Sequence, residues 1–337
     1  MKEPVKKFIR KSRDGILSSV YRRIDSLDLI LAETDKKIEL LQNELRDLNN
    51  KADASENQIK NSGVIQISEE EMIAKLFTGI KMYLDPRDIS VSPHIALDSI
   101  WEHHITKAWL SVIQPEWTIL DIGANFGYFG AIAAQKTNKK KSSVILFEPN
   151  PELIPYIKKT LAVNWLNEQS VVENLAVSDK NGSVELNVLK DYIASSSLHT
   201  SKHIDEYMHN KMYVKTDRVI NVKSVTIDDY CRQNKIDEVN LIKMDIEGFE
   251  DRAYSGMREM VKRSKDITLF VEFTKESYAK PKDYYDQMLA DFGHVYVIDS
   301  SGNIIKPQTN RYQDVIGNAD DWVMPVFSKR RNLNEVV

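Results

Sequence analysis

The sequence predicts an α/β domain with a mostly parallel sheet, preceded by a long N-terminal helix. From Thr118 onward, short apolar runs typical of buried strands alternate with segments of helical length. Such alternation favours a parallel sheet with helices on both faces. Polar residues directly follow several of these strands, where sheets of this kind bind ligands. Residues 17–55 carry a heptad repeat, which predicts the helix.

Composition narrows the possible functions. The chain has 337 residues and a formal net charge of −4, from 46 basic and 50 acidic residues. This balance argues against a nucleic-acid partner, because neutralising phosphates requires a basic surplus. The single cysteine, Cys231, excludes an intrachain disulfide and a cysteine-rich metal site. With no signal-peptide core and no apolar run of about 18 residues, we expect a cytoplasmic protein.

The heptad repeat predicts a coiled coil over residues 17–55. Apolar residues recur at alternating steps of three and four, which implies self-association. The segment from Arg23 to Asp28 is similar to a trimer-favouring pattern, so a trimer is favoured over a dimer. A helix folded back on its own domain is the alternative. The a-positions are Leu17, Ile24, Leu31, Ile38, Leu45 and Ala52.

The segments flanking the heptads differ in character. Residues 1–16 are basic with interspersed apolar side chains, so they could contact an anionic membrane face or stay solvated. Residues 56–66 are polar and predict a linker. Residues 67–330 then form the globular domain.

Within that domain we expect a helix from Ser68, capped through Glu71, and short strands at 81–84 and 89–91. The polar insertion 190–221, which carries His199, His203 and His209, suggests a substrate lid or a surface loop. The further expected strands are 118–122, 143–147, 171–176, 183–189, 239–244 and 267–273, with 294–298 and 322–327 as a late antiparallel hairpin.

The strand ends carry the candidate site. Gly123 and Gly127 allow a tight turn and close approach of the backbone to a ligand. Glu148, at the tip of the second strand, can accept hydrogen bonds from both hydroxyls of a ribose. Asn174 follows the third strand, where an adenine edge could be recognised. Asp245 follows the fourth strand, together with Glu247.

A dinucleotide site fits this pattern poorly. The turn has the glycine pattern G-x-N-x-G rather than G-x-G-x-x-G, and no group is left for a pyrophosphate. A single nucleoside with a charged tail fits better, which points to S-adenosylmethionine.

The segments ILDIGANFGYFG, FEPNPE, NLAVSD and KMDIEGFE, in this order, resemble the FkbM family of S-adenosylmethionine-dependent methyltransferases. The resemblance runs from about Thr78 to Val326. It implies a Rossmann-like class I methyltransferase fold and O-methylation, often of sugars or natural products. It also implies cofactor contacts for the matching segments, which hold Asp121, Gly123, Asn125, Phe126, Glu148, Pro149, Asn174, Ala176 and Asp245.

From these features we expect methyl transfer to a sugar hydroxyl of a bacterial-type glycan or polysaccharide precursor. An alcohol is a weak nucleophile, so a base is needed, and the candidates are Asp245, Glu247 and His104. No metal site is expected, although a divalent cation near Asp245 could also activate the hydroxyl. A glycosyltransferase is a candidate partner. The alternatives are a methyltransferase of a small natural product and a non-catalytic coiled-coil scaffold with a nucleoside-binding domain.

Overall fold

The computed structural model describes residues 36–38, 42, 63–138, 143–189, 216–317 and 322–333. Two compact units, Met1–Asn61 and Ser62–Val337, are distinguished. Most of the predicted coiled coil, the basic segment 1–16 and the insertion up to residue 215 lie outside the described residues. Of the heptad segment, residues 36–38 and 42 are described and helical. No helix of the described ranges is long and apolar enough to cross a bilayer.

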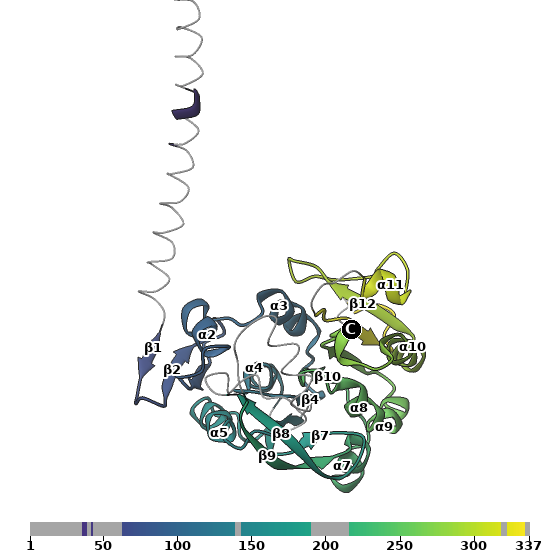
Figure 1. Ribbon diagram of the computed structural model, residues 1–337, viewed down its shortest axis with the longest axis horizontal. Coiled ribbons are helices and arrows are strands. Elements are labelled where there is room, and N and C mark those ends of the chain that lie inside the picture. Colours follow the sequence, from purple (N-terminus) through teal and green to yellow (C-terminus); the bar gives the residue numbers. More distant parts are fainter. Residues whose placement is uncertain are drawn as a thin grey trace, which may run out of the picture. The chain divides into compact units, whose positions relative to one another are not determined.

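An eight-stranded sheet forms the centre of the described globular unit, and β4 and β10 lie side by side within it (Figure 1). The strand order is β13-β12-β14-β11-β10-β4-β5-β6. The five strands from β11 to β6 are parallel to one another. The strands are β4 (Thr118–Ile122), β5 (Ser143–Phe147), β6 (Ser170–Glu173), β10 (Leu241–Met244), β11 (Thr268–Val271), β12 (His294–Ile298), β13 (Ile304–Ile305) and β14 (Val326–Ser328).

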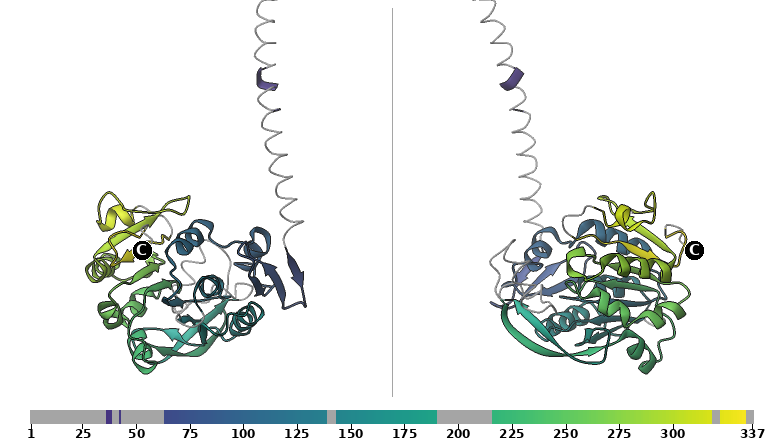
Figure 2. Two further views of the ribbon diagram at one scale, coloured as in Figure 1. Left: turned by 180° about the vertical axis from the view of Figure 1, so that it is seen from behind. Right: turned by 45° about the vertical axis from the view of Figure 1, so that its right-hand side comes forward.

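Helices cover both faces of this sheet (Figure 2), as expected for buried strands that alternate with helices. One apolar cluster packs α3, α4 and α5 against one face, and a second packs α7 to α10 against the other. The helices are α2 (Ser92–Asp98), α3 (His103–Val112), α4 (Tyr128–Lys136), α5 (Ile154–Val163), α7 (Ile227–Gln233), α8 (Glu250–Ser255), α9 (Arg258–Arg263), α10 (Pro281–Phe292) and α11 (Tyr312–Val315), with a 3₁₀ turn η2 (Lys275–Ser277).

The late antiparallel pair is confirmed. β14 lies between β11 and β12 and is antiparallel to both. The connection is longer than a hairpin, because β13 and α11 come between the two strands in the sequence. This arrangement of a parallel core with one inserted antiparallel strand is the Rossmann-like architecture that the sequence predicted.

A smaller sheet holds β7 (Ala176–Val177), β8 (Gly182–Leu189) and β9 (Thr216–Val225). The prediction assigned the start of β9 to a polar insertion. β9 pairs along its length with β8, antiparallel, and its Ser224 pairs with Ala176. In β9, exposed residues such as Asn221 and Lys223 alternate with buried ones such as Val222. This alternation is typical of a strand, but it was hidden by the polar composition of the segment.

The predicted helix at Ser68 is wrong. The chain instead forms β1 (Val64–Gln66), β2 (Met72–Lys75) and β3 (Lys81–Leu84), which pair as an antiparallel sheet. The Ser68 hydroxyl accepts a hydrogen bond from the Glu70 amide at 3.2 Å, two residues on, and so stabilises a turn rather than a helix start. Alternate residues of β2 are buried, which is the period of a strand.

The predicted strand at 89–91 is also wrong. Asp88 is buried, and its Oδ2 accepts hydrogen bonds from the amides of Val91 and Ser92, both at 2.9 Å. These bonds satisfy amides at the start of α2, so the apolar pair Ile89 and Val91 leads into a helix.

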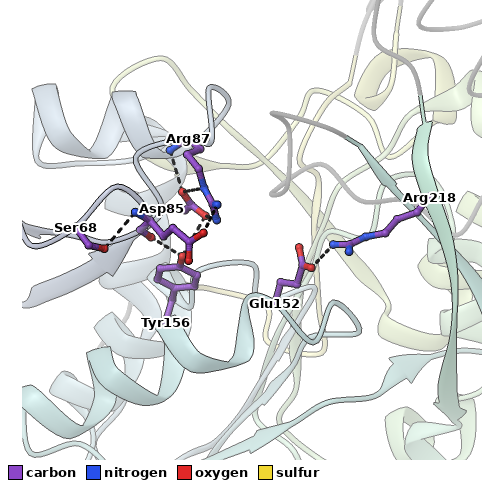
Figure 3. Close-up of polar contacts among 7 residues, drawn as sticks. Ser68, Asp85, Arg87, Glu152, Tyr156 and Arg218 are labelled. Atoms are coloured by element: carbon purple, nitrogen blue, oxygen red, sulfur yellow. Dashed lines mark hydrogen bonds and ion pairs between the residues drawn. The ribbon is translucent and has the colours of Figure 1, made fainter.

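Polar contacts join the N-terminal strands to α5 (Figure 3). The Tyr156 hydroxyl donates to the Glu70 carbonyl at 2.6 Å and to Asp85 at 3.1 Å. Arg87 pairs with both Asp85 and Glu70. The neighbouring Glu152 forms an ion pair with an arginine of β9. The segment that precedes β4 in the sequence is therefore held against α5, which packs on the central sheet.

Trp109 of α3 tests the packing over one face. Its ring is fully buried and meets Phe270 and Phe129 edge-on, at centroid distances of 5.3 and 6.1 Å. We expect Trp109→Ala to lower the free energy of unfolding by about 3–5 kcal/mol, because the cavity cannot be refilled. Urea denaturation measures this. Trp165→Ala is the control, because Trp165 is 79% exposed, and an equal loss in both variants would contradict the packing.

Candidate active site

Four parallel strands end at the same level, which brings the predicted segments together. In the register of the sheet, Ile122 lies beside Phe147 and Met244, and Met244 lies beside Val271. The residues that follow these four positions therefore share one edge. The structure thus brings Gly123, Glu148 and Asp245 together just beyond the carboxyl ends of β4, β5 and β10.

The glycine turn after β4 packs against the loop after β10. Gly123 has φ of +82° and Gly127 has φ of +84°, values that favour glycine. The amides of Gly123 and Ala124 donate to the Phe147 carbonyl, both at 3.0 Å. A Cβ on Gly123 would lie 1.8 Å from the main-chain oxygen of Asp245. Only glycine permits this approach of the two loops.

Glu148 lies buried at the tip of β5 and binds the glycine turn. Its Oε2 accepts the amide of Asn125 at 2.7 Å, and its Oε1 accepts the amide of Asn150 at 2.8 Å. Burial raises the pKa of Glu148 to about 8, although both amide bonds oppose the shift. Each carboxylate oxygen has a second lone pair, so the group can still accept hydroxyl donors.

Asn174 stabilises the same corner from the end of β6. Its Nδ2 donates to the carbonyls of Glu148 and Pro149, both at 2.9 Å. The side chain amide is therefore used to fix the turn after β5. Ala176, also predicted near the adenine, is buried in β7 among the apolar residues of the small sheet.

Asp121 lies beneath the turn, 1% exposed, and its carboxylate accepts the Gly130 amide near the start of α4. Its Oδ2 has no hydrogen-bond partner. Burial raises the pKa of Asp121 to about 6, while the charge of Lys243 opposes the shift. A buried carboxylate oxygen without a donor is costly, so it marks a place where a ligand donor would be favourable.

Lys243 of β10 is the cation of the site. Its Nζ donates to Asp245 Oδ2 at 2.7 Å and lies 4.4 Å from the ring centre of Phe129. Burial alone would lower its pKa, but the charges of Asp245, Glu102 and Asp121 raise it above the ordinary value. Lys243 is therefore a buried ammonium that pairs with the Asp245 carboxylate.

Glu250 fixes the backbone of the loop after β10. This buried carboxylate accepts the Ile246 amide at 2.9 Å, the Gly248 amide at 3.2 Å and the Tyr278 hydroxyl at 2.7 Å. Burial raises the pKa of Glu250 to about 7. The bonds fix Glu247 in the left-handed region, with φ of +57°, and leave its side chain exposed.

Two acids of the site were missed. Glu272 follows β11, and its carboxyl is hydrogen-bonded to that of Asp245; loss of solvent and the charge of Asp245 raise its pKa well above the ordinary value. Glu102 precedes α3, and its pKa is raised to about 7 by burial. Glu272 could have been found from the sequence, because it is an acid that directly follows an apolar strand, as Glu148 does.

Phe126, predicted to contact the cofactor, and His104, predicted as a possible base, make other contacts than those predictions suggest. Phe126 is buried, with its ring edge-on to Tyr156 at 5.5 Å, and its amide donates to Asn125 Oδ1 at 2.8 Å. Its role in this structure is to support the turn. His104 lies in the first turn of α3, and within the described residues its side chain has no hydrogen bond or ion pair with the acids of the site.

Comparisons with known proteins identify the domain. Residues 121–298 match the Methyltransferase FkbM domain. The chain is 27% identical over 161 residues to the 2-O-methyltransferase NoeI of Sinorhizobium fredii, and 22% identical over 169 residues to the hexuronic acid methyltransferase AglP of Haloferax volcanii. These matches cover 46% and 48% of this chain, and 63% and 62% of those two proteins.

Among solved structures, the chain is similar to the methyltransferase FkbM of Methylobacillus flagellatus KT. It is 15% identical, with a TM-score of 0.38, and the match covers 69% of this chain and 52% of that chain.

The residues at the strand ends fit S-adenosylmethionine, the cofactor of such domains. Glu148 offers acceptors for ribose hydroxyls, the glycine turn brings the backbone close, and the unpartnered Asp121 Oδ2 suits a cationic ligand. The sulfonium and ammonium groups of the cofactor would supply that charge among the acids around Lys243. Since the family match covers more than half of the sequence, this chain belongs to the FkbM family of methyltransferases.

Proposed function

We propose that the protein transfers a methyl group from S-adenosylmethionine to a hydroxyl of a sugar in a glycan or polysaccharide precursor. The sugar class is supported by the names of the two relatives, a 2-O-methyltransferase and a hexuronic acid methyltransferase. The reaction type is supported by a carboxylate at the rim of the sheet, placed to receive a proton.

The chain's own residues align the reactants. When bound, the cofactor supplies an electrophilic methyl group on a sulfonium. Glu148 and the turn at Gly123 would hold the adenosine part at the carboxyl edge. Because methyl transfer is an in-line displacement, most of the catalytic benefit comes from fixing the acceptor oxygen, the methyl carbon and the sulfur on one line.

The observation that carries the proposal is the environment of Asp245. Its carboxylate pairs with the Lys243 ammonium at 2.7 Å and is 24% exposed, and its main-chain oxygen lies against the glycine turn. In the proposed step the acceptor oxygen forms a bond to the methyl carbon as the carbon–sulfur bond breaks. The hydroxyl proton passes to Asp245, whose carboxyl group is hydrogen-bonded to that of Glu272.

Replacing Asp245 tests this role. We expect Asp245→Asn to lower kcat by about 10²- to 10⁴-fold, because Asn cannot take a proton but can still accept the Lys243 hydrogen bond. Affinity for S-adenosylhomocysteine should be retained. Transfer of labelled methyl to polysaccharide precursors measures the rate, and calorimetry measures the affinity.

Glu247→Gln is the matched comparison, because Glu247 lies exposed in the same loop. A larger loss of kcat in Glu247→Gln than in Asp245→Asn would assign the base to Glu247. Label found only in protein or in small metabolites would contradict a sugar acceptor.

We further propose that the heptads over residues 17–55 assemble the protein into an oligomer, with a trimer favoured over a dimer. Ile38, at an a-position, is helical and 47% exposed in the single chain, as expected for a side chain that is buried in assembly. A rod of this kind would present the basic segment 1–16 in several copies to an anionic membrane face or to a glycosyltransferase.

Sedimentation tests the assembly. We expect the full chain to sediment as a trimer and the double variant Leu31→Glu, Ile38→Glu as a monomer, because charge at a-positions disfavours the interface. Glu33→Gln, between those positions in the heptad, is the control and should leave the oligomer intact. A monomeric wild type would refute the proposal.

A further inference from the structure

Glu102 occupies a helix-capping position without capping the helix. It directly precedes α3, where an acid normally accepts amide hydrogen bonds and stabilises the helix dipole. Here its side chain makes no capping hydrogen bond, and its backbone is left-handed, with φ of +44°. A non-glycine residue held in this conformation is strained. The carboxylate is therefore not used to stabilise the helix.

That carboxylate enters the site with an unsatisfied oxygen. Glu102 Oε2 is buried and has no hydrogen-bond partner. After burial, the charges that act on the group are those of Lys243 and Asp245, so Glu102 belongs to the electrostatic environment of the site. A buried acceptor without a donor and a strained backbone both reduce stability, and such costs are concentrated at functional sites.

The neighbours do not supply the missing donor. The Lys243 ammonium donates to Asp245 at 2.7 Å, and the Tyr128 hydroxyl lies near Thr106. Asp121 carries a second buried oxygen without a partner, and both acids act on the charge of Lys243. Glu102, before α3, and Asp121, in β4, each leave an acceptor open, and the charges of both raise the pKa of one lysine. This pattern calls for a ligand that brings both positive charge and hydrogen-bond donors.

We propose that Glu102 binds the α-ammonium group of the methionine part of S-adenosylmethionine. The ammonium has three donors, whereas the sulfonium has none, so only the ammonium satisfies a bare carboxylate oxygen. The ribose hydroxyls are assigned to Glu148, which binds the amide of Asn125 in the glycine turn. The inference rests on the proposed function, because it assigns one group of that cofactor to one residue.

Two ligands that differ only in the amino-acid tail test the inference. S-adenosylhomocysteine carries the ammonium, and 5′-methylthioadenosine lacks the whole tail. We expect Glu102→Gln to weaken the binding of S-adenosylhomocysteine about 10- to 100-fold, the range for a charged hydrogen bond. The affinity for 5′-methylthioadenosine should be unchanged. Calorimetry with the full chain gives both dissociation constants.

The outcomes separate the inference from the proposed function. Equal weakening of both ligands would assign Glu102 a structural role, and unchanged affinity with a raised KM for the acceptor would place it at the acceptor; either result overturns the inference. A wild type that binds neither ligand would instead refute the proposed function. Glu168→Gln, at an exposed acid, is the control. Without ligand, the Tm of Glu102→Gln should equal or exceed that of the wild type, because a buried carboxyl group without a hydrogen-bond donor is replaced by an amide that carries no charge.

Discussion

At Gly123 the turn after β4 approaches the carbonyl of Asp245 so closely that a Cβ would lie 1.8 Å from its oxygen. This contact sets the geometry of the whole site. It brings the turn that ends in Gly127 against the acidic loop, while the amides of the turn are bound by the Phe147 carbonyl and by Glu148. Side chains from three strands therefore meet within one edge, although they lie far apart in the sequence.

The electrostatics of this edge favour a cationic ligand. Burial raises the pKa of Asp121 to about 6, of Glu102 to about 7 and of Glu148 to about 8, and Lys243 is the buried cation that offsets them. Each raised pKa means that the folded protein holds protons which the unfolded chain has released, so these groups reduce stability as the pH rises toward 8. A ligand with positive charge relieves this cost, which couples binding to the stability of the domain.

Much of the parallel core was predictable, because β4, β5, β10 and β11 are mostly apolar and the carboxyl ends of parallel strands share an edge. That reasoning located Asp121, Glu148 and Asp245. It also yielded the family resemblance that the domain match confirmed.

The errors have physical causes. Ser68 satisfies the pattern of a helix cap, but its hydroxyl accepts an amide two residues on and forms a turn. Glu102 belongs to no strand end, so its place beside Lys243 depends on how α3 packs and on a left-handed backbone that the sequence does not reveal. Phe126 lies within the turn, but the direction of its ring is decided by packing against Tyr156.

The proposed site binds the adenosine part of the cofactor through Glu148. Calorimetric titration of Glu148→Ala with S-adenosylhomocysteine tests this binding most directly. The affinity should fall about 10-fold or more, because the ribose hydroxyls lose their acceptors and the Asn125 amide loses its partner. Glu168→Ala, at an exposed acid, should bind as the wild type does. Unchanged affinity in a folded Glu148→Ala variant would show that the nucleoside does not bind at this edge of the sheet.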